Sequence, residues 1–371
     1  MDPYDTKDTL LRVMCVVWFI MRIRGKNMWL IENRTYPVIP VFEFFDGYPP
    51  VIQALLFYTS LLCMGILVVF PRRTEVSIIL FIVALSSCIL DVITWQPWEY
   101  QYIGMLAVFI INRNNPKAFY SCIILILASI YFYSGLQKFN GGFLHSIWEG
   151  LILKQFFGIP RIKVSLVFHY AGLALPIIEA AAGVGLLFSR SKRTAAFILI
   201  SMHLFIVALL GTLQGYNIVI PWNIVMIGFL HFLFINKNTS FTFLAVIKKE
   251  NLLIAILWGI MPAFSFIGYW DQKLSSNLFS GRYVTMVVCI KNEVDAKYFK
   301  NYIFNDDRYC VCKGVNMLST GTWTRIDMHV LPSPANWYYQ KVKKKFIKQH
   351  PEIKAEFLTY TYPFKQFKEV K

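Results

Sequence analysis

The chain has 371 residues, of which 56% are hydrophobic and 17% aromatic, and its mean hydropathy is +0.50. This composition excludes an ordinary soluble domain and predicts a polytopic membrane protein in contact with a lipid bilayer. The formal net charge of +16 would suit a nucleic-acid-binding protein. Much of that charge falls in short loops between apolar runs, so we expect no nucleic-acid partner.

About nine apolar runs are candidates to cross a hydrocarbon core of about 30 Å. They are residues 8–24, 50–70, 75–93, 99–112, 117–137, 164–188, 194–212, 217–235 and 250–269. The fourth run is short, which suits a tilted helix or one embedded among its neighbours. The first lacks a small-residue cleavage site, so we do not expect a cleaved signal peptide. Residues 1–270 are therefore predicted to form an all-α bundle of transmembrane helices.

The basic residues of the short loops predict an orientation in an inner (plasma) membrane. They fall in alternate connections: Arg72 with Arg73, Arg113 with Lys117, Arg190 with Lys192 and Arg193, and Lys237 with Lys248 and Lys249. We expect these loops and the N-terminus to be cytoplasmic, which leaves the C-terminal domain outside. Lys26 and Arg34, and more mildly Arg22 and Arg24, fit this orientation less well.

Residues 271–371 are predicted to be a small extracytoplasmic α+β domain. We expect strands at 282–290, 308–313, 322–331 and 356–362, and a helix at 336–349 between Pro334 and Pro351. The basic run 341–348 suits a solvated helix face near headgroups or a protein partner. Cys289, Cys310 and Cys312 allow one disulfide and leave one thiol. Two close thiols without a nearby histidine are a weak metal signal, so we expect no metal.

The most informative segment is residues 131–142, in which an apolar helix runs into Lys138 and stops at Asn140-Gly141-Gly142. Two interpretations stay open for this lysine. It can extend its ammonium to water at the membrane interface, or it can face a polar cavity.

Three polar residues are predicted at membrane depth, where ionisable groups are costly and point to function. These are Glu179 after Pro176, His203 near the centre of its span, and Asn223. With spans centred on one midplane and about 1.5 Å rise per residue, the three share one layer. Lys138 then lies about 15 Å above the midplane on the same estimate, too far to contact Glu179. Glu179 can instead be protonated, or paired with His203, and simply tie helices together.

Aromatic residues collect after the third span, on the side predicted for Lys138. The segment 91–102 contains Trp95, Trp98, Tyr100 and Tyr102 with two acids, Asp91 and Glu99. Taken singly they suit an aromatic belt. Taken together they suit the mouth of a site, with Trp95, Trp98, Tyr102 and the deeper Asn223 as substrate-binding residues.

Several motifs over about residues 10–235 resemble the vitamin K-dependent gamma-carboxylases and their bacterial relatives, the horizontally transferred transmembrane (HTTM) domain proteins. The Leu90–Trp95 segment with Tyr100 and Tyr102 is similar to a family motif, and Gly135-Leu-Gln-Lys138-Phe-Asn is similar to the segment that holds the family's lysine base. Glu179 followed by small residues, and His203 on a helix, match later positions with shifts. The segment 270–281 looks like a Bacteroidetes subset of HTTM and, more distantly, DoxX-like proteins.

The resemblance implies a chemistry. In the carboxylases a lysine helps to deprotonate reduced vitamin K, which reacts with oxygen. Carried over by position, it nominates Lys138 as the base, with Glu179 and His203 as further catalytic residues and a quinone or menaquinol as the cofactor. Two departures count against carboxylation itself: Trp98 stands where the carboxylases have a histidine, and the C-terminal domain is far shorter.

Two other functions stay open. The chain could be a non-catalytic subunit or assembly factor that docks a membrane or periplasmic partner through residues 271–371. A transporter that uses Glu179 and His203 is the third reading, although the sequence shows no internal repeat and no paired broken helices.

Overall fold

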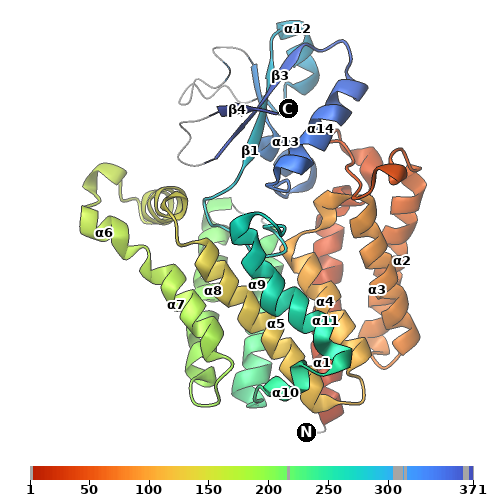
Figure 1. The fold of residues 1–371 in the computed structure, drawn as a ribbon. Coiled ribbons are helices and arrows are strands. Elements are labelled where there is room, and N and C mark those ends of the chain that lie inside the picture. Colours follow the sequence, from red (N-terminus) through yellow and green to blue (C-terminus); the bar gives the residue numbers. More distant parts are fainter. Residues whose placement is uncertain (1–2, 215–217, 304–311, 313–315, 362–366, 371) are drawn as a thin grey trace.

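The computed structural model describes residues 3–214, 218–303, 312, 316–361 and 367–370. It is mostly helical and has a small antiparallel sheet near the C-terminus (Figure 1). The helices of the bundle are α1 (Pro3–Arg24), α2 (Pro50–Val69), α3 (Thr74–Leu90), α4 (Pro97–Ile111), α5 (Pro116–Gln137), η5 (Phe143–Phe156), α6 (Leu166–Ala171), α7 (Ala174–Gly185), α8 (Lys192–Gln214), α9 (Val219–Leu230), η7 (His231–Asn236), α10 (Phe243–Val246), α11 (Leu252–Ile254), η9 (Ala255–Ile260) and η10 (Met261–Ile267). The C-terminal domain contains β1 (Thr285–Ile290), α12 (Glu293–Ala296), β2 (Asn316–Ser319), α13 (Thr320–Met328), α14 (Asn336–Gln349), β3 (Ala355–Tyr360) and β4 (Phe367–Glu369).

Each predicted apolar run coincides with helical structure. Among the described residues, six helical segments are long and apolar enough to cross a membrane, namely 50–69, 116–137, 166–185, 192–213, 219–236 and 249–267, and α3 is a shorter apolar helix. These six are compatible with a multi-pass membrane protein. The count of about nine spans stays a prediction.

The centre of the bundle is α5, of whose membrane-length window 83% is buried inside the protein. Figure 1 shows α5 running through the middle of the bundle. Pro116 opens the helix in its first turn, and the Asn115 side chain caps it by accepting from the Ala118 backbone N–H. The helix ends at Lys138, as the Asn-Gly-Gly sequence predicts. Its buried faces position the site described below.

The sheet of the C-terminal domain has the order β2-β1-β3-β4, and all its pairs are antiparallel. Strand β1 is central, with Val287 opposite both Ser319 and Leu358. A disulfide joins Cys289 to Cys312, one of the pairings that the three cysteines allow, while Cys310 lies outside the described residues. Helix α14 has the predicted bounds, and most of the predicted strand 308–313 also falls outside the described residues.

The strand predicted at 322–331 is wrong, because residues 320–328 form helix α13. Threonines and a tryptophan favour a strand by propensity. The buried positions instead follow a helical period: Trp323, Thr324, Asp327 and Met328 are all buried on one face. His329 ends the helix in the left-handed conformation, with φ of 61°.

Helix α13 joins the C-terminal domain to the loop between α1 and α2. The Asp327 carboxylate accepts four hydrogen bonds: from the Thr35 backbone N–H (2.9 Å) and hydroxyl (3.0 Å), the Tyr36 N–H (2.8 Å) and the Tyr302 hydroxyl (2.7 Å). Trp323 donates its indole N–H to the Thr35 hydroxyl at 2.7 Å. The domain is therefore attached to the bundle by a buried polar junction.

We expect Asp327→Ala to open this junction. It leaves two backbone N–H groups without an acceptor, at a cost of about 2–4 kcal/mol. Hydrogen exchange should show faster exchange in 320–328, measured against the exposed control Glu293→Ala. Equal protection in both variants would contradict the role given to Asp327.

Candidate functional site

The site is centred on Lys138, the C-cap residue of α5. Its ammonium lies 2.9 and 2.6 Å from the two Glu179 oxygens and 2.8 Å from the Ser134 hydroxyl, to which it donates. The exposed fractions of the Lys138 and Glu179 side chains are only 13% and 7%. The lysine therefore faces a partner inside the protein rather than open water.

Glycines bring α5 and α7 close enough for this ion pair to form. A Cβ added at Gly135 would lie 2.6 Å from the Pro176 carbonyl oxygen and 2.7 Å from the Ala180 backbone nitrogen. On the other side of the interface, a Cβ at Gly183 would lie 2.7 Å from the Phe132 nitrogen. Small residues at such an interface let two helix backbones touch.

The predicted separation in depth between Lys138 and Glu179 is wrong. The two close approaches place α7 antiparallel to α5, with Glu179 level with Ser134. The Lys138 side chain points back along its helix toward Ser134, as helical side chains do. The estimate failed because it centred residues 164–188 on the midplane. The chain instead breaks between α6 and α7, where Pro176 prevents a regular turn, and α6 extends past the end of α5 (Figure 1).

The ion pair borders an apolar cavity of about 280 Å³. Apart from Lys138 and Glu179, every residue that lines it is apolar; the others are Phe143, Ile147, Leu151, Ile152, Leu175, Pro176, Ile178, Ile198, Met202, Phe205, Ile206, Leu209, Leu210 and Phe279. They come from η5, α7, α8 and the segment before β1. The cavity thus pairs an apolar wall with one charged end, the arrangement expected of a binding site for a lipid-like molecule.

A second, smaller cavity of about 40 Å³ shares Lys138 and Glu179 with the first and reaches His203 and Asn223. His203 Nδ1 lies 2.7 Å from Asn223 Oδ1, and His203 Nε2 lies 2.7 Å from the Tyr131 hydroxyl. Because the Asn223 amide nitrogen donates to the Val219 carbonyl, its oxygen faces the histidine. His203 therefore carries its proton on Nδ1 and accepts from Tyr131.

Four of the predicted site residues thus meet around one pair of cavities. They are Lys138, Glu179, His203 and Asn223, and the contact of His203 is with Asn223 rather than Glu179. Trp95, Trp98 and Tyr102 line neither cavity. Tyr102 packs on Trp18, with ring centroids 5.5 Å apart, and Trp95 packs on Tyr100.

Phe279 lines both cavities and was not predicted from the sequence. Its segment is held against the start of η5 because Gly142 and Gly281 touch backbone to backbone, and a Cβ on either would lie 2.3 Å or less from the other. Gly281 has φ of +67°. Phe279 has φ of 53°, an uncommon conformation for a bulky residue. Such strain clusters at ligand sites; the Gly141-Gly142 pair was the only sequence signal.

Two further buried ion pairs lie elsewhere in the bundle. Arg22 pairs with Glu99, which also accepts from the Trp18 indole at 2.6 Å, and Arg34 pairs with Asp91. All four charged side chains are at most 1% exposed. Asp91 and Glu99 of the aromatic segment therefore hold structural contacts. Arg22 and Arg34, which fit the predicted orientation poorly, both form ion pairs with these two acids.

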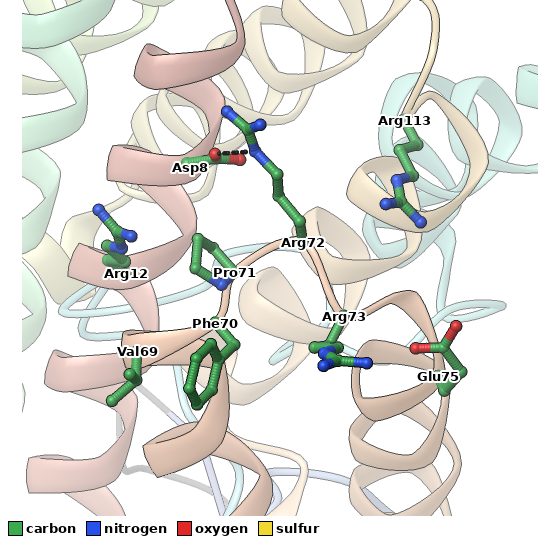
Figure 2. A pocket seen from close by; sticks show the side chains of 9 residues that line it. All are labelled: Asp8, Arg12, Val69, Phe70, Pro71, Arg72, Arg73, Glu75 and Arg113. Carbon is green, nitrogen blue, oxygen red and sulfur yellow. Dashed lines mark hydrogen bonds and ion pairs between the residues drawn. The ribbon is translucent and has the colours of Figure 1, made fainter.

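The pocket in Figure 2 lies where α1, the α2–α3 loop and the end of α4 meet. Arg12, Arg72, Arg73 and Arg113 surround about 560 Å³ together with Asp8 and Glu75, and Asp8 binds Arg72 at 2.7 Å. The pocket therefore brings together two of the basic loops that the sequence predicts on one side of the membrane, the loop with Arg72 and Arg73 and the loop with Arg113. Its positive lining suits an anionic headgroup.

Comparisons with protein-family models, curated proteins and solved structures give no match for this chain. The resemblance to the HTTM and gamma-carboxylase proteins therefore stays a prediction.

The packing of α5 on α7 gives a direct test. We expect Gly135→Ala to destabilise the protein by about 1–3 kcal/mol, because the new methyl group would overlap α7 backbone atoms. The matched control is Gly65→Ala in α2, where a Cβ meets nothing within 4 Å. Thermal unfolding in detergent compares the two. Equal unfolding midpoint temperatures for Gly135→Ala and Gly65→Ala would contradict the close contact between α5 and α7.

Proposed function

We propose that the protein is a membrane-embedded enzyme that acts on a lipid-like substrate of the quinol class, with Lys138 as the proton acceptor. The observation that carries the proposal is the Lys138–Glu179 pair at the charged end of the apolar cavity. An isoprenoid or other apolar tail suits the cavity wall. The substrate hydroxyl would then lie at the only charged groups in that lining.

The ion pair supports proton transfer in the following way. An ammonium cannot accept a proton, so Lys138 must first become a neutral amine. Passing its proton to the Glu179 carboxylate, 2.6 Å away, would give that amine beside a protonated acid. The amine can then accept a quinol hydroxyl proton. Dioxygen, the oxidant that the family resemblance implies, then takes two electrons and the second hydroxyl proton, which leaves the quinone and a hydroperoxide anion. The Lys138 ammonium returns the first proton to that anion, so the products are the quinone and hydrogen peroxide and the lysine is again a neutral amine.

Ser134, His203 and Asn223 support the base rather than replace it. The Ser134 hydroxyl accepts a further hydrogen bond from the ammonium. His203 is fixed between Tyr131 and Asn223 by two hydrogen bonds, so it is a positioning residue at the wall of the smaller cavity. Of these three residues, Ser134 is the one whose contact restricts the geometry of the lysine.

Lys138→Met tests this function. Purified protein should oxidise a menaquinol or vitamin K hydroquinone analogue faster than the uncatalysed reaction, and the variant should lose at least about 100-fold, the lower range for general base catalysis. Lys154→Met is the matched control, because Lys154 is exposed on η5, the helix that contributes Phe143, Ile147, Leu151 and Ile152 to the cavity.

In Lys138→Met alone, Glu179 stays behind as a buried acid without its partner, which can prevent folding. The double variant Lys138→Met/Glu179→Gln removes that acid, so a loss of activity in the folded double variant reports lost chemistry and not lost folding. Quinol oxidation by the folded double variant at the wild-type rate would refute the proposal.

We also propose the orientation predicted from the loops, in an inner membrane with the N-terminus cytoplasmic and the C-terminal domain outside. Its support is that two of the four exceptions, Arg22 and Arg34, form buried ion pairs. Cysteine labelling of an Ile162→Cys variant, whose isoleucine is 94% exposed in the η5–α6 connection, should succeed from outside intact cells; labelling only after the cells are opened would reverse the orientation.

A non-catalytic subunit that docks a partner through residues 271–371 is the second candidate. One observation favours it: α14 exposes Trp337, Ile347, Lys344 and Lys348. The three other α14 lysines are used within the chain. Lys341 donates to the Pro40 and Val41 carbonyls, Lys343 donates to the Val370 carbonyl, and Lys345 pairs with Asp46. Co-purification of one stoichiometric protein, lost in Lys344→Glu/Lys348→Glu, would support docking; purification of the protein alone would count against it.

A further inference from the structure

A cluster of nitrogen and oxygen ligands lies apart from the Lys138 site, where η5 meets α6. His145 and Glu149 are on η5 and His169 is on α6. His169 Nδ1 lies 2.6 Å from one Glu149 oxygen and His145 Nδ1 lies 3.0 Å from the other. One ligand atom from each residue falls within 4.8 Å of the other two.

The chemistry of the cluster is that of a transition-metal site. Two imidazole nitrogens and one carboxylate are the ligand set that divalent ions such as Zn²⁺ accept, with metal–ligand distances of about 2.0–2.2 Å. Ligand atoms around such an ion lie about 3–3.5 Å apart, by the same bond lengths. The two histidine–carboxylate spacings need changes of a few tenths of an ångström, and the widest separation, up to 4.8 Å, has to close by about an ångström.

The two elements that carry the ligands are held together by other contacts. The Trp148 indole donates to the Phe168 carbonyl at 3.0 Å, and its ring packs edge-on against Phe168. A Cβ at Gly172 would lie 2.5 Å from the Trp148 ring. The cluster is thus preformed by packing, which lowers the ordering cost of binding an ion.

Arg161 is the group that opposes a cation here. Its Nε lies 3.7 Å from the Glu149 carboxylate, and its guanidinium also donates to the His145 carbonyl. The Arg161 side chain is 54% exposed, so it can turn toward water when an ion takes its place. Arg161 and a metal ion then compete for the same carboxylate.

We propose that His145, Glu149 and His169 form a binding site for a divalent transition-metal ion of the zinc class, which fastens α6 to η5. The other face of η5 contributes Ile147, Leu151 and Ile152 to the apolar cavity. The ion would therefore brace one cavity wall from outside. This site is separate from Lys138, so neither proposal depends on the other.

Titration of tag-free, EDTA-treated full-length protein tests the site, with Zn²⁺ followed by calorimetry and Co²⁺ by its visible absorption. We expect one ion per chain and a higher unfolding temperature with Zn²⁺. His169→Asn should weaken binding by more than the roughly 10–100-fold that loss of a residue behind a ligand costs, because it removes one of the three ligands themselves. The matched control His231→Asn, an exposed histidine on η7, should bind as the wild type does.

Arg161→Gln separates a metal site from a simple hydrogen-bonded cluster. If Arg161 competes with the ion, this variant should bind Zn²⁺ about tenfold more tightly. No stoichiometric uptake by the wild type, or equal affinities of His169→Asn and His231→Asn, would overturn the proposal.

Discussion

The ion pair between Lys138 and Glu179 is the contact on which the site depends. Two charges at most 13% exposed are costly unless they meet in good geometry, and each becomes a liability without the other. The pair therefore fixes the register of α7 against α5. A slip by one helical turn, about 5.4 Å, would separate the charges and displace the helix that forms one wall of the apolar cavity. The close contact at Gly135 and Gly183 permits this one register.

The same principle organises the rest of the bundle. Arg22–Glu99 ties α1 to α4, and Arg34–Asp91 ties the α1–α2 loop to the end of α3. Asp327 then fastens the C-terminal domain to that loop. Ionisable groups at depth are thus mostly structural here. Lys138 and Glu179 differ because they also border a cavity.

The helices could be predicted from the sequence because apolar runs end at prolines, asparagines and charged residues, as at Pro116 and Asn140. Helix α14 was equally clear between Pro334 and Pro351. Helix α13 is not predicted, because its threonines favour a strand by propensity and the helical spacing of its buried residues appears only in the folded structure. Helix η5 was missed because a mixed polar and apolar run after two glycines has no clear period.

Four residues of the site could be predicted from residue type alone. Lys138, Glu179, His203 and Asn223 are polar residues in or at the ends of apolar runs. Their grouping did not follow, because it depends on a break before α7 that shifts Glu179 toward the end of α5. Nor could spacing show that the Gly142–Gly281 contact brings Phe279 over the cavity. The aromatic segment 91–102 was expected beside Lys138, yet Trp95, Trp98 and Tyr102 line neither cavity.

An experimental density map of the protein in lipid nanodiscs, with a quinol analogue added, tests the central claim most directly. The account predicts elongated density along η5, α7 and α8, with its polar end within hydrogen-bond distance of Lys138 while Glu179 and Ser134 stay in contact with the lysine. A cavity closed by side chains, or a Lys138 ammonium turned to the headgroups away from Glu179, would contradict it.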